Sequence, residues 1–313
     1  MDKFYLYDQL TEGHKKKSVL ATDKEAAATG RWRGGSSGCI LNDTCVIGAD
    51  PRQVVLRFLG VQIPKTYDEQ LMLDAGYANE DMMLQYLDAN KTTYKCEEDI
   101  PMVYTLAGTD ELVTGRPDII LGDTEEGEFV PKLGVEAKLI CSPHKAHSLS
   151  SWGKAEPSTD HVIQAAHYAS FFDIPYVLAY TCRVWNMLPG YVCKFPDKHL
   201  TDPEHRAISF PNGKFFMAKP FQTFYDLRWD KGVLLVDDVK TKVTVDGIHK
   251  FYKYCSDCIK NKEIPKLRSG STDFMGQPTK KNKVLEYYDF KDADNETDFD
   301  AWVEACREIA RRV

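Results

Sequence analysis

Two ionisable residues interrupt an apolar segment near the middle of the chain. The segment is LGVEAKLI, residues 133–140, and it contains Glu136 and Lys138. Because strand side chains alternate between two faces, a strand here places Glu136 and Lys138 on one face and their apolar neighbours on the other. An antiparallel strand with one solvated face shows the same alternation. Taken alone, the pair therefore fits a surface strand as well as a reactive site.

A third ionisable residue, Asp118, begins the preceding apolar run. It lies in GRPDIIL, residues 115–121, and the polar segment GDTEEG, residues 122–127, follows. A hairpin that turns through 122–127 places Asp118 beside Glu136. Adjacent carboxylates repel each other, and a divalent cation removes that repulsion.

These residue types suit metal-assisted hydrolysis of a phosphodiester. Oxygen ligands favour Mg²⁺, with Mn²⁺ as a substitute. The ammonium of Lys138 can orient or help deprotonate a water molecule, and it can stabilise charge on a phosphate. Phosphodiester hydrolysis needs such a clamp more than it needs a covalent nucleophile.

Two helical patterns supply further polar side chains. Glu80 shares a helix face with the apolar residues three, four and seven positions later. A carboxylate on that face needs a partner, either a structural Arg or Lys or a metal ion. In residues 159–172, His161, Gln164 and Tyr168 form one polar stripe, which a partly exposed helix edge also explains.

Four motifs in this order resemble the PD-(D/E)xK nuclease superfamily, and within it the lambda-type phage exonucleases and the RecB-like nucleases. They are GYANE (76–80), GRPD (115–118), VEAK (135–138) and QAAHY (164–168). The resemblance covers about residues 75–185. The segments before and after this range contain no motif of the superfamily that we can match.

The resemblance implies a role for each matched position. Asp118 and Glu136 correspond to the metal ligands, together with the backbone carbonyl of Ala137, and Lys138 corresponds to the catalytic lysine. Glu80 corresponds to the helical glutamate near the metals, and Gln164 and Tyr168 correspond to the QxxxY motif. The implied activity is that of a Mg²⁺-dependent DNA exonuclease acting in phage-like recombination or DNA degradation.

Two alternatives stay open beside the exonuclease. One is an endonuclease of the same superfamily, of restriction or CRISPR-adaptation type, and the other is a non-catalytic DNA-binding protein with the same fold. The expected partner is DNA, and a homo-oligomer and a single-strand annealing protein are further candidates. The expected location is the cytoplasm, or the host cytoplasm if the chain is encoded by a virus.

The elements that position these residues predict an α/β fold with a mixed central sheet flanked by helices, a restriction-endonuclease-like core. We expect one domain, 1–313, with its core at about 68–200 and with 1–67 and 201–313 as extensions. The predicted strands are 94–106, 111–121, 129–141, 175–184 and 190–195. The predicted helices are 50–60, 68–89 with a break or kink at Gly76, 159–172, 245–262 and the last 14 or so residues. Flexible loops are predicted at 31–38 and 267–283.

Composition limits the remaining classes of protein. The net charge of the 313 residues is -7, which argues against a protein that holds DNA by bulk charge. The basic stretch from Lys138 to Lys154 is a local candidate for DNA contact. The chain contains no apolar run near the roughly 20 residues that span a bilayer, so we expect no membrane partner.

The cysteines indicate a reducing environment and no metal cluster. Their number is nine, with no spacing typical of a disulfide framework. Cys255 and Cys258 form a CxxC motif, but no third cysteine follows closely, so we predict neither an iron–sulfur cluster nor a zinc site.

Overall fold

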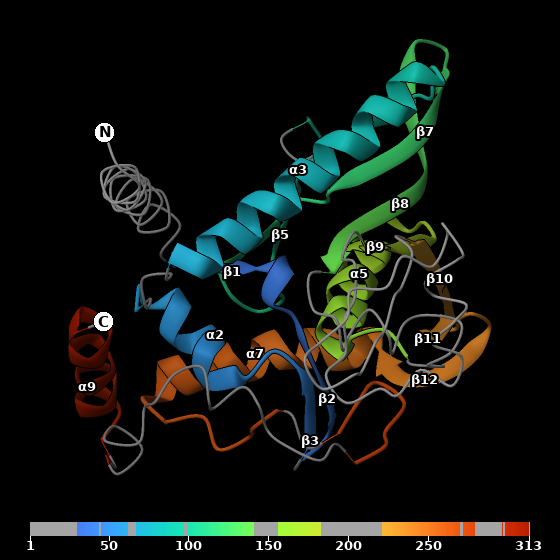
Figure 1. Cartoon of the computed structure of the whole chain (residues 1–313). Coiled ribbons are helices and arrows are strands. Elements are labelled where there is room, and N and C mark those ends of the chain that lie inside the picture. Colours follow the sequence, from blue (N-terminus) through green and yellow to red (C-terminus); the bar gives the residue numbers. More distant parts are fainter. Residues whose placement is uncertain are drawn as a thin grey trace, which may run out of the picture.

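A seven-stranded sheet forms the centre of the protein in a computed structural model (Figure 1). The structure describes residues 30–43, 45–61, 67–96, 99–140, 156–182, 221–269, 272–278, 296 and 298–312. Within these ranges the chain is a mixed α/β protein, as the sequence predicted. The strand order is β12-β11-β10-β9-β8-β7-β4. The bounds are β4 Tyr94–Lys95, β7 Ile119–Glu125, β8 Glu128–Ile140, β9 Tyr176–Cys182, β10 Phe221–Asp230, β11 Val233–Val236 and β12 Val239–Thr244.

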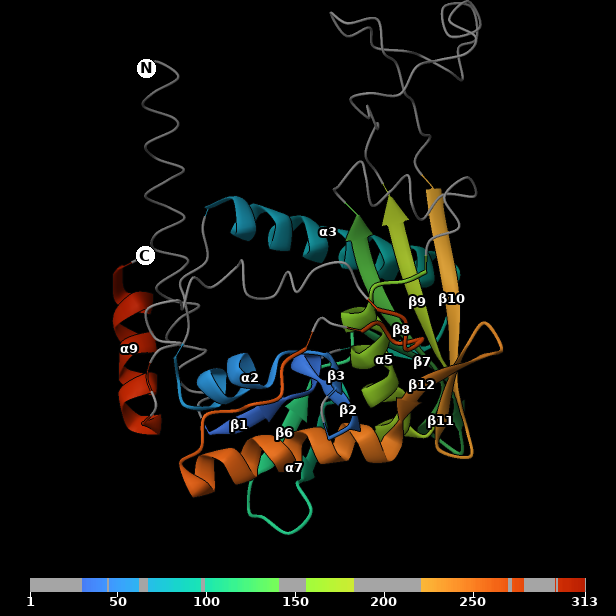
Figure 2. The same ribbon diagram turned by 90° about the horizontal axis from the view of Figure 1, so that it is seen from below.

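Helices cover both faces of this sheet (Figure 2). On one face, α3 (Tyr67–Ala89) packs its C-terminal half against the sheet, where Met83, Leu84 and Leu87 contact a small cluster centred on Val135. On the other face lies α5 (Thr159–Phe172), which connects the parallel strands β8 and β9. Parallel neighbours require such a crossover connection. The helix predicted at 159–172 and the strand predicted at 175–184 are therefore confirmed.

The segment RWRGGSSG, predicted as a flexible loop, is instead part of the core. It forms β1 (Arg31–Arg33) and a short 3-10 helix η1 (Gly34–Ser36). Trp32 is 1% exposed, stacks on Phe58 with ring centroids 4.1 Å apart, and donates a 2.7 Å hydrogen bond from Nε1 to Glu111. Burying an indole with its N–H satisfied favours order over flexibility at this position.

Two predicted strands are each split between two sheets. The range 94–106 contains β4 and β5 (Met102–Thr105), and the range 111–121 contains β6 (Leu112–Gly115) and the start of β7. In a separate three-stranded sheet, β6 is the central strand between β1 and β5, and β2 (Gly38–Asn42) pairs with β3 (Cys45–Gly48). The break after β6 falls at Pro117, which has no N–H to donate to a strand neighbour. The β7–β8 hairpin itself is confirmed, and its turn is Glu126–Gly127.

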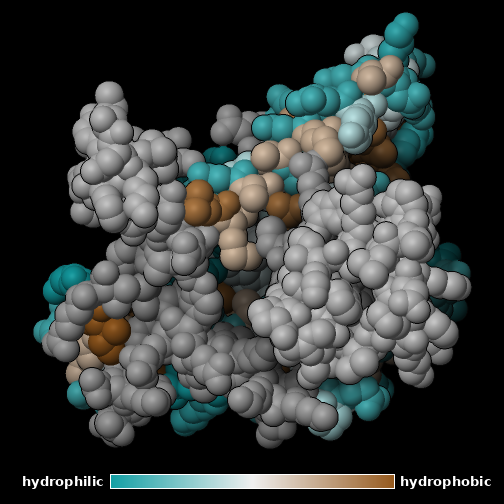
Figure 3. Space-filling model, viewed as in Figure 1, coloured by the Kyte–Doolittle hydropathy of each residue, from teal (hydrophilic) through white to brown (hydrophobic). Residues whose placement is uncertain are grey.

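Helix α3 continues through Gly76, where the sequence predicted a break or kink. A glycine inside a helix costs only about 1 kcal/mol, which the neighbouring helix-forming residues and the packed C-terminal half offset. The N-terminal half exposes apolar side chains, including Leu71, Met72 and Tyr77, and Figure 3 shows the resulting apolar surface along α3.

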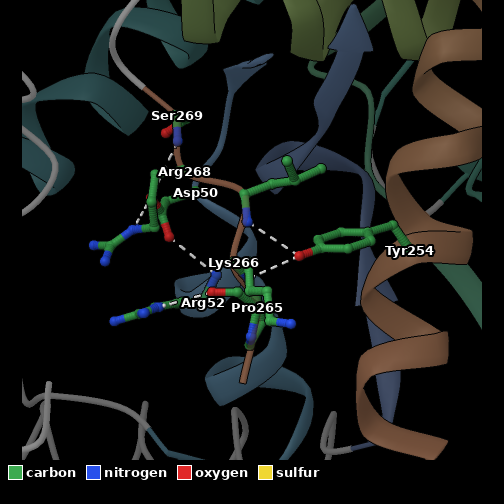
Figure 4. A network of polar contacts seen from close by, with 8 residues as sticks. Asp50, Arg52, Tyr254, Pro265, Lys266, Arg268 and Ser269 are labelled. Atoms are coloured by element: carbon green, nitrogen blue, oxygen red, sulfur yellow. Dashed lines mark hydrogen bonds and ion pairs between the residues drawn. The ribbon is translucent and has the colours of Figure 1, made fainter. Parts of the chain in front are cut away.

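A network of polar contacts around Asp50 joins three segments that are distant in sequence (Figure 4). The Asp50 carboxylate is 1% exposed and caps α2 (Pro51–Phe58) by accepting from the Arg52 N–H at 3.0 Å. It also accepts from Arg268 Nε at 3.1 Å and from the Ser269 N–H at 3.3 Å. Tyr254, on α7 (Val245–Asn261), accepts from the backbone N–H groups of residues 266 and 267. The chain after α7 is thereby fixed against α2.

The main buried cluster extends from Trp32 to Ala310 and so includes residues on both sides of 68–200. The last helix, α9 (Phe299–Arg312), contributes Trp302 and Cys306 to it. The strand predicted at 190–195 lies outside the described residues. Among the helices that are described, none combines the length and the apolar character that a membrane crossing requires.

Candidate active site

The β7–β8 hairpin brings Asp118 next to Glu136. Ile119 is paired with Val135 across the hairpin. Asp118, which precedes Ile119, therefore lies across from Glu136, which follows Val135. The Asp118 carboxylate accepts a 2.7 Å hydrogen bond from the backbone N–H of Ala137. Val135 faces α3, and because strand side chains alternate, Glu136 and Lys138 do not share its face. The arrangement expected from the sequence pattern is therefore present in the hairpin.

Glu136 is a carboxylate with no exposed surface. Lys138, whose side chain is 21% exposed, donates a hydrogen bond and forms an ion pair to Oε1 of Glu136. The other oxygen, Oε2, is buried and has no hydrogen-bond partner among the described residues. Burial raises the pKa of Glu136, the charge of Lys138 opposes this change, and the nearby Glu80 carboxylate adds to it.

The balance of charge keeps Lys138 protonated. Burial lowers the pKa of Lys138, but Glu136, Asp118 and Glu80 together outweigh burial and raise the pKa above its ordinary value. In this arrangement the side chain is a cation and not a base. It can neutralise and orient a negatively charged group, whereas accepting a proton from water would require a change in its surroundings.

A third carboxylate, Glu80, acts on the Glu136–Lys138 pair through its charge. It lies on α3 in the turn before Met83 and Leu84, which contact the sheet, and its charge acts on both Glu136 and Lys138. The helix face predicted for Glu80 is therefore the face that meets the sheet. Three carboxylates and one ammonium give this site an excess of negative charge, which favours a cation.

The Gln164–Tyr168 pair lies against the same site. Tyr168 is 2% exposed, and its hydroxyl is hydrogen bonded to the Gln164 side chain and to the Arg116 backbone. Burial, followed by the charges of Glu136 and Asp118, raises the pKa of Tyr168. The sequence placed Tyr168 on a polar helix stripe, either as the tyrosine of a QxxxY motif or as part of a partly exposed helix edge. The residue is buried, and two glycines make room for its ring.

Those glycines show why GRPD and RWRGGSSG carry glycine where they do. A Cβ atom on Gly115 would lie 2.5 Å from Cε1 of Tyr168, and one on Gly34 would lie 3.1 Å from the same atom. Both distances are shorter than ordinary contacts between carbon atoms. Gly115, in the strand before Asp118, thus allows the QxxxY tyrosine to approach the carboxylates.

Tyr176 belongs to the site and was missed by the sequence reasoning. Its hydroxyl is buried with no hydrogen-bond partner among the described residues, and its ring lies over Gly134, where a Cβ atom would be 2.0 Å away. Burial raises the pKa of Tyr176, and the charges of Glu136, Tyr168 and Asp118 add to this effect. The signal in the sequence is Gly134, which begins the GVEAK motif and leaves space for a large neighbour.

Ser36 and Gly35 also lie near the site, although the sequence predicted a flexible loop there. A Cβ atom on Gly35 would lie 3.5 Å from Nε2 of Gln164. Arg57, on α2, donates a 2.6 Å hydrogen bond to the Ser36 hydroxyl. The η1 turn is thus fixed between α2 and the QxxxY pair, so it adds polar groups to the edge of the site.

His161, the third member of the predicted stripe, contacts a tyrosine of β9. Its Nδ1 is 2.8 Å from the hydroxyl of Tyr180, which is paired with Lys138 across the parallel strands. In the basic stretch from Lys138 to Lys154, positions 141–154 lie outside the described residues.

The residues of the site fit a divalent cation in their donor chemistry but not in the arrangement of three ligand side chains. An orphaned carboxylate oxygen on Glu136 beside Asp118 and Glu80 is the chemistry that Mg²⁺ prefers. In the described part of the chain, however, no three His, Cys, Asp or Glu side chains are arranged to hold a metal ion. The predicted ligand set includes three such side chains, Asp118, Glu136 and Glu80, beside the Ala137 carbonyl, and the structure does not bring these three into that arrangement.

The CxxC cysteines are buried thiols on α7. Cys255 is 0% exposed and Cys258 is 5% exposed. Burial raises the pKa of both thiols, which makes them poor thiolate ligands.

Comparison with known proteins gives no relative. No protein-family model, no curated protein and no solved structure matches this chain.

Proposed function

We propose that this chain is a metal-dependent deoxyribonuclease of the PD-(D/E)xK type that degrades DNA from its ends. The observation that carries the proposal is the convergence of Asp118, Glu136 and Lys138 at the β7–β8 hairpin, with Glu80 and the Gln164–Tyr168 pair beside them. A structural ion pair requires only one carboxylate and leaves no carboxylate oxygen without a partner. A metal-dependent phosphodiesterase site uses additional carboxylates and an available carboxylate oxygen to hold its cation.

Each residue has a role that follows from its position. Asp118, Glu136 and the Ala137 carbonyl would hold Mg²⁺ or Mn²⁺, and Glu80 would add negative charge on the α3 side. Lys138 is a cation, so it stabilises charge on the phosphate and orients the attacking water. The Gln164 amide and the Tyr168 hydroxyl are hydrogen bonded to each other and position the strand or Lys138.

The bound cation would supply a more acidic water molecule and charge stabilisation of the leaving oxygen. It would also replace Lys138 as the neutralising partner of Glu136. Lys138 would then be available to the phosphate. The negative charge gathered by Glu80, Asp118 and Glu136 repels DNA, which is a second reason that binding of the substrate should require a divalent cation.

The overall charge favours exonuclease over endonuclease. At a net charge of -7 a broad electrostatic clamp on duplex DNA is unfavourable, whereas a channel can concentrate a few cations along one strand. We therefore propose that the enzyme acts at free ends, and a homo-oligomer would be one way to build such a channel.

Digestion of linear and covalently closed circular DNA with Mg²⁺ tests this function. The proposal predicts progressive loss of the linear DNA while the circles survive. Conversion of supercoiled circles to linear product would support the endonuclease alternative at the same site. Binding of both substrates with no cleavage in Mg²⁺ or Mn²⁺ would instead indicate a non-catalytic DNA-binding protein.

A further inference from the structure

A cavity lies on the other side of α5 from the sheet. Its volume is about 500 Å³, which is in the range of small-molecule sites. It lies between β5 with its following turn, the C-terminal part of α5 and the first half of α7. The lining residues that matter for ligand recognition are Tyr104, His167, Phe171, His249, Lys250 and Lys253. None of these is a residue of the proposed cleavage site.

The walls of this cavity are aromatic. Tyr104 and Phe171 are stacked with ring centroids 6.0 Å apart, and the ring of His249 lies 6.3 Å from Tyr104. Phe171 is 38% exposed, although His167 and Tyr168, one turn earlier on α5, are buried. Part of the Phe171 ring is therefore exposed beside Tyr104, and stacking on an aromatic ring favours nucleobases of any sequence.

The rim of the cavity is basic. Lys250 and Lys253 line it together with His249, and no aspartate or glutamate is among the lining residues. Each lysine has one carboxylate partner on its own helix, Asp246 for Lys250 and Asp257 for Lys253. Both pairs are exposed, so these pairs are weak, and each ammonium has further N–H donors for a second anion.

The imidazole of His167 forms the floor of the cavity, and both of its ring nitrogens are hydrogen bonded. The Nε2 atom of His167 is 2.8 Å from the Tyr104 hydroxyl, and its Nδ1 atom is 2.6 Å from the Ser37 hydroxyl. Burial lowers the pKa of His167 to about 3, so the ring is uncharged at neutral pH. The floor thus presents no positive charge at neutral pH, which places the site for an anion at the lysines on the rim.

We propose that this cavity binds one mononucleotide, with its base against Phe171 and Tyr104 and its phosphate at Lys250 and Lys253. Aromatic walls, a basic rim and the absence of acidic lining residues fit an aromatic ligand with a negative charge. The volume fits a single nucleotide and excludes a duplex. The proposal goes beyond cleavage of DNA, and its test does not require cleavage.

Calorimetric titration of the full chain with deoxyadenosine monophosphate tests the proposal. We expect saturable binding with a dissociation constant below about 1 mM, weakened by added salt. Deoxyadenosine lacks the phosphate and inorganic phosphate lacks the base, so each should bind at least about 10-fold more weakly. Absence of saturable binding by the monophosphate would overturn the proposal.

Substitutions of the lining residues test whether the mononucleotide binds in this cavity. Phe171→Ala should weaken binding roughly 5- to 100-fold, and Phe171→Trp should restore it because the aromatic face is kept. Lys250→Ala combined with Lys253→Ala should weaken binding and reduce its salt dependence. The matched controls are Phe224→Ala, a phenylalanine that is 56% exposed on β10, and Lys132→Ala, an exposed lysine paired with Glu125. Both controls should bind as the wild type does.

One more variant separates this cavity from the cleavage site. Lys138→Met should leave nucleotide binding unchanged. If Lys138→Met weakens binding and Phe171→Ala does not, the nucleotide occupies the cleavage site and the proposal is wrong. A Phe171-dependent complex with a single-stranded oligonucleotide, without binding of the monophosphate, would also contradict it.

Discussion

Replacing Lys138 by Met should destabilise the protein as well as stop cleavage. The substitution keeps the apolar stem of the side chain and removes the ammonium that neutralises Glu136, a carboxylate with no exposed surface. Removing one partner of a buried ion pair costs about 3 to 5 kcal/mol. Because the Lys138 side chain keeps 21% exposure, we expect the lower end, about 3 kcal/mol, or roughly 5 °C in melting temperature for a chain of 313 residues.

The loss of stability in Lys138→Met should become larger as pH rises. Without Lys138 the pKa of Glu136 rises further above its value in the unfolded chain. The folded variant then holds a proton that the unfolded chain releases, so stability falls as pH rises from the unfolded pKa towards the folded one. The difference from wild type should therefore be larger at pH 8 than at pH 5.

Thermal and denaturant unfolding in excess chelator measures this effect. Glu136→Gln combined with Lys138→Met should recover at least half of the loss at pH 8, since no buried charge is left without a partner. Lys132→Met, which breaks an exposed pair with Glu125, is the control and should unfold like the wild type. If Lys138→Met is as stable as this control at pH 8, Lys138 does not neutralise a buried charge on Glu136.

Three further perturbations test other parts of the structure. Asp118→Asn should weaken Mn²⁺ binding roughly 10-fold or more, and undiminished binding in a titration would remove Asp118 from the ligands. Tyr176→Phe should slow cleavage about 10-fold without loss of stability, because its buried hydroxyl has no partner among the described residues, and wild-type kinetics would exclude it from the site. Asp50→Ala should cost about 2 to 4 kcal/mol in denaturant unfolding, since three donors lose their acceptor, and a cost near zero would contradict that network.

The arrangement of the proposed cleavage site could be predicted from the sequence because its geometry is local. Glu136 and Lys138 are two residues apart on one strand, so alternation alone places them on one face. Asp118 is joined to them by a hairpin, whose register follows from a short polar turn. The helix at 159–172 was predicted with its observed ends because it has a regular apolar pattern and a Ser158 cap position.

The surroundings of the site could not be predicted because they depend on contacts between distant residues. β1 pairs in parallel with β6, about 80 residues later, and nothing in RWRGGSSG indicates that partner. Trp32 is ordered by Phe58 and Glu111, which also come from other parts of the chain. Glycine-rich composition therefore predicted flexibility where the glycines in fact allow close packing against Tyr168.

Tyr176 shows the same limit at the level of one residue. Its place in the strand after α5 was predicted, but its ring lies beside the carboxylates, whose charges act on its hydroxyl, because Tyr176 is paired with Gly134 across parallel strands. The register of a parallel pair depends on the packing of the crossover helix, which the amino-acid pattern of the strands does not encode.

The most direct test of the account is the rate at which end-labelled linear duplex DNA is hydrolysed in Mg²⁺ by the wild type and by Lys138→Met. The account predicts cleavage by the wild type that stops in excess chelator, and a variant slower by about 100-fold or more at a temperature where both are folded. Full wild-type activity in chelator, or a variant within about threefold of the wild-type rate, would contradict the assignment of Asp118, Glu136 and Lys138 as the cleavage site.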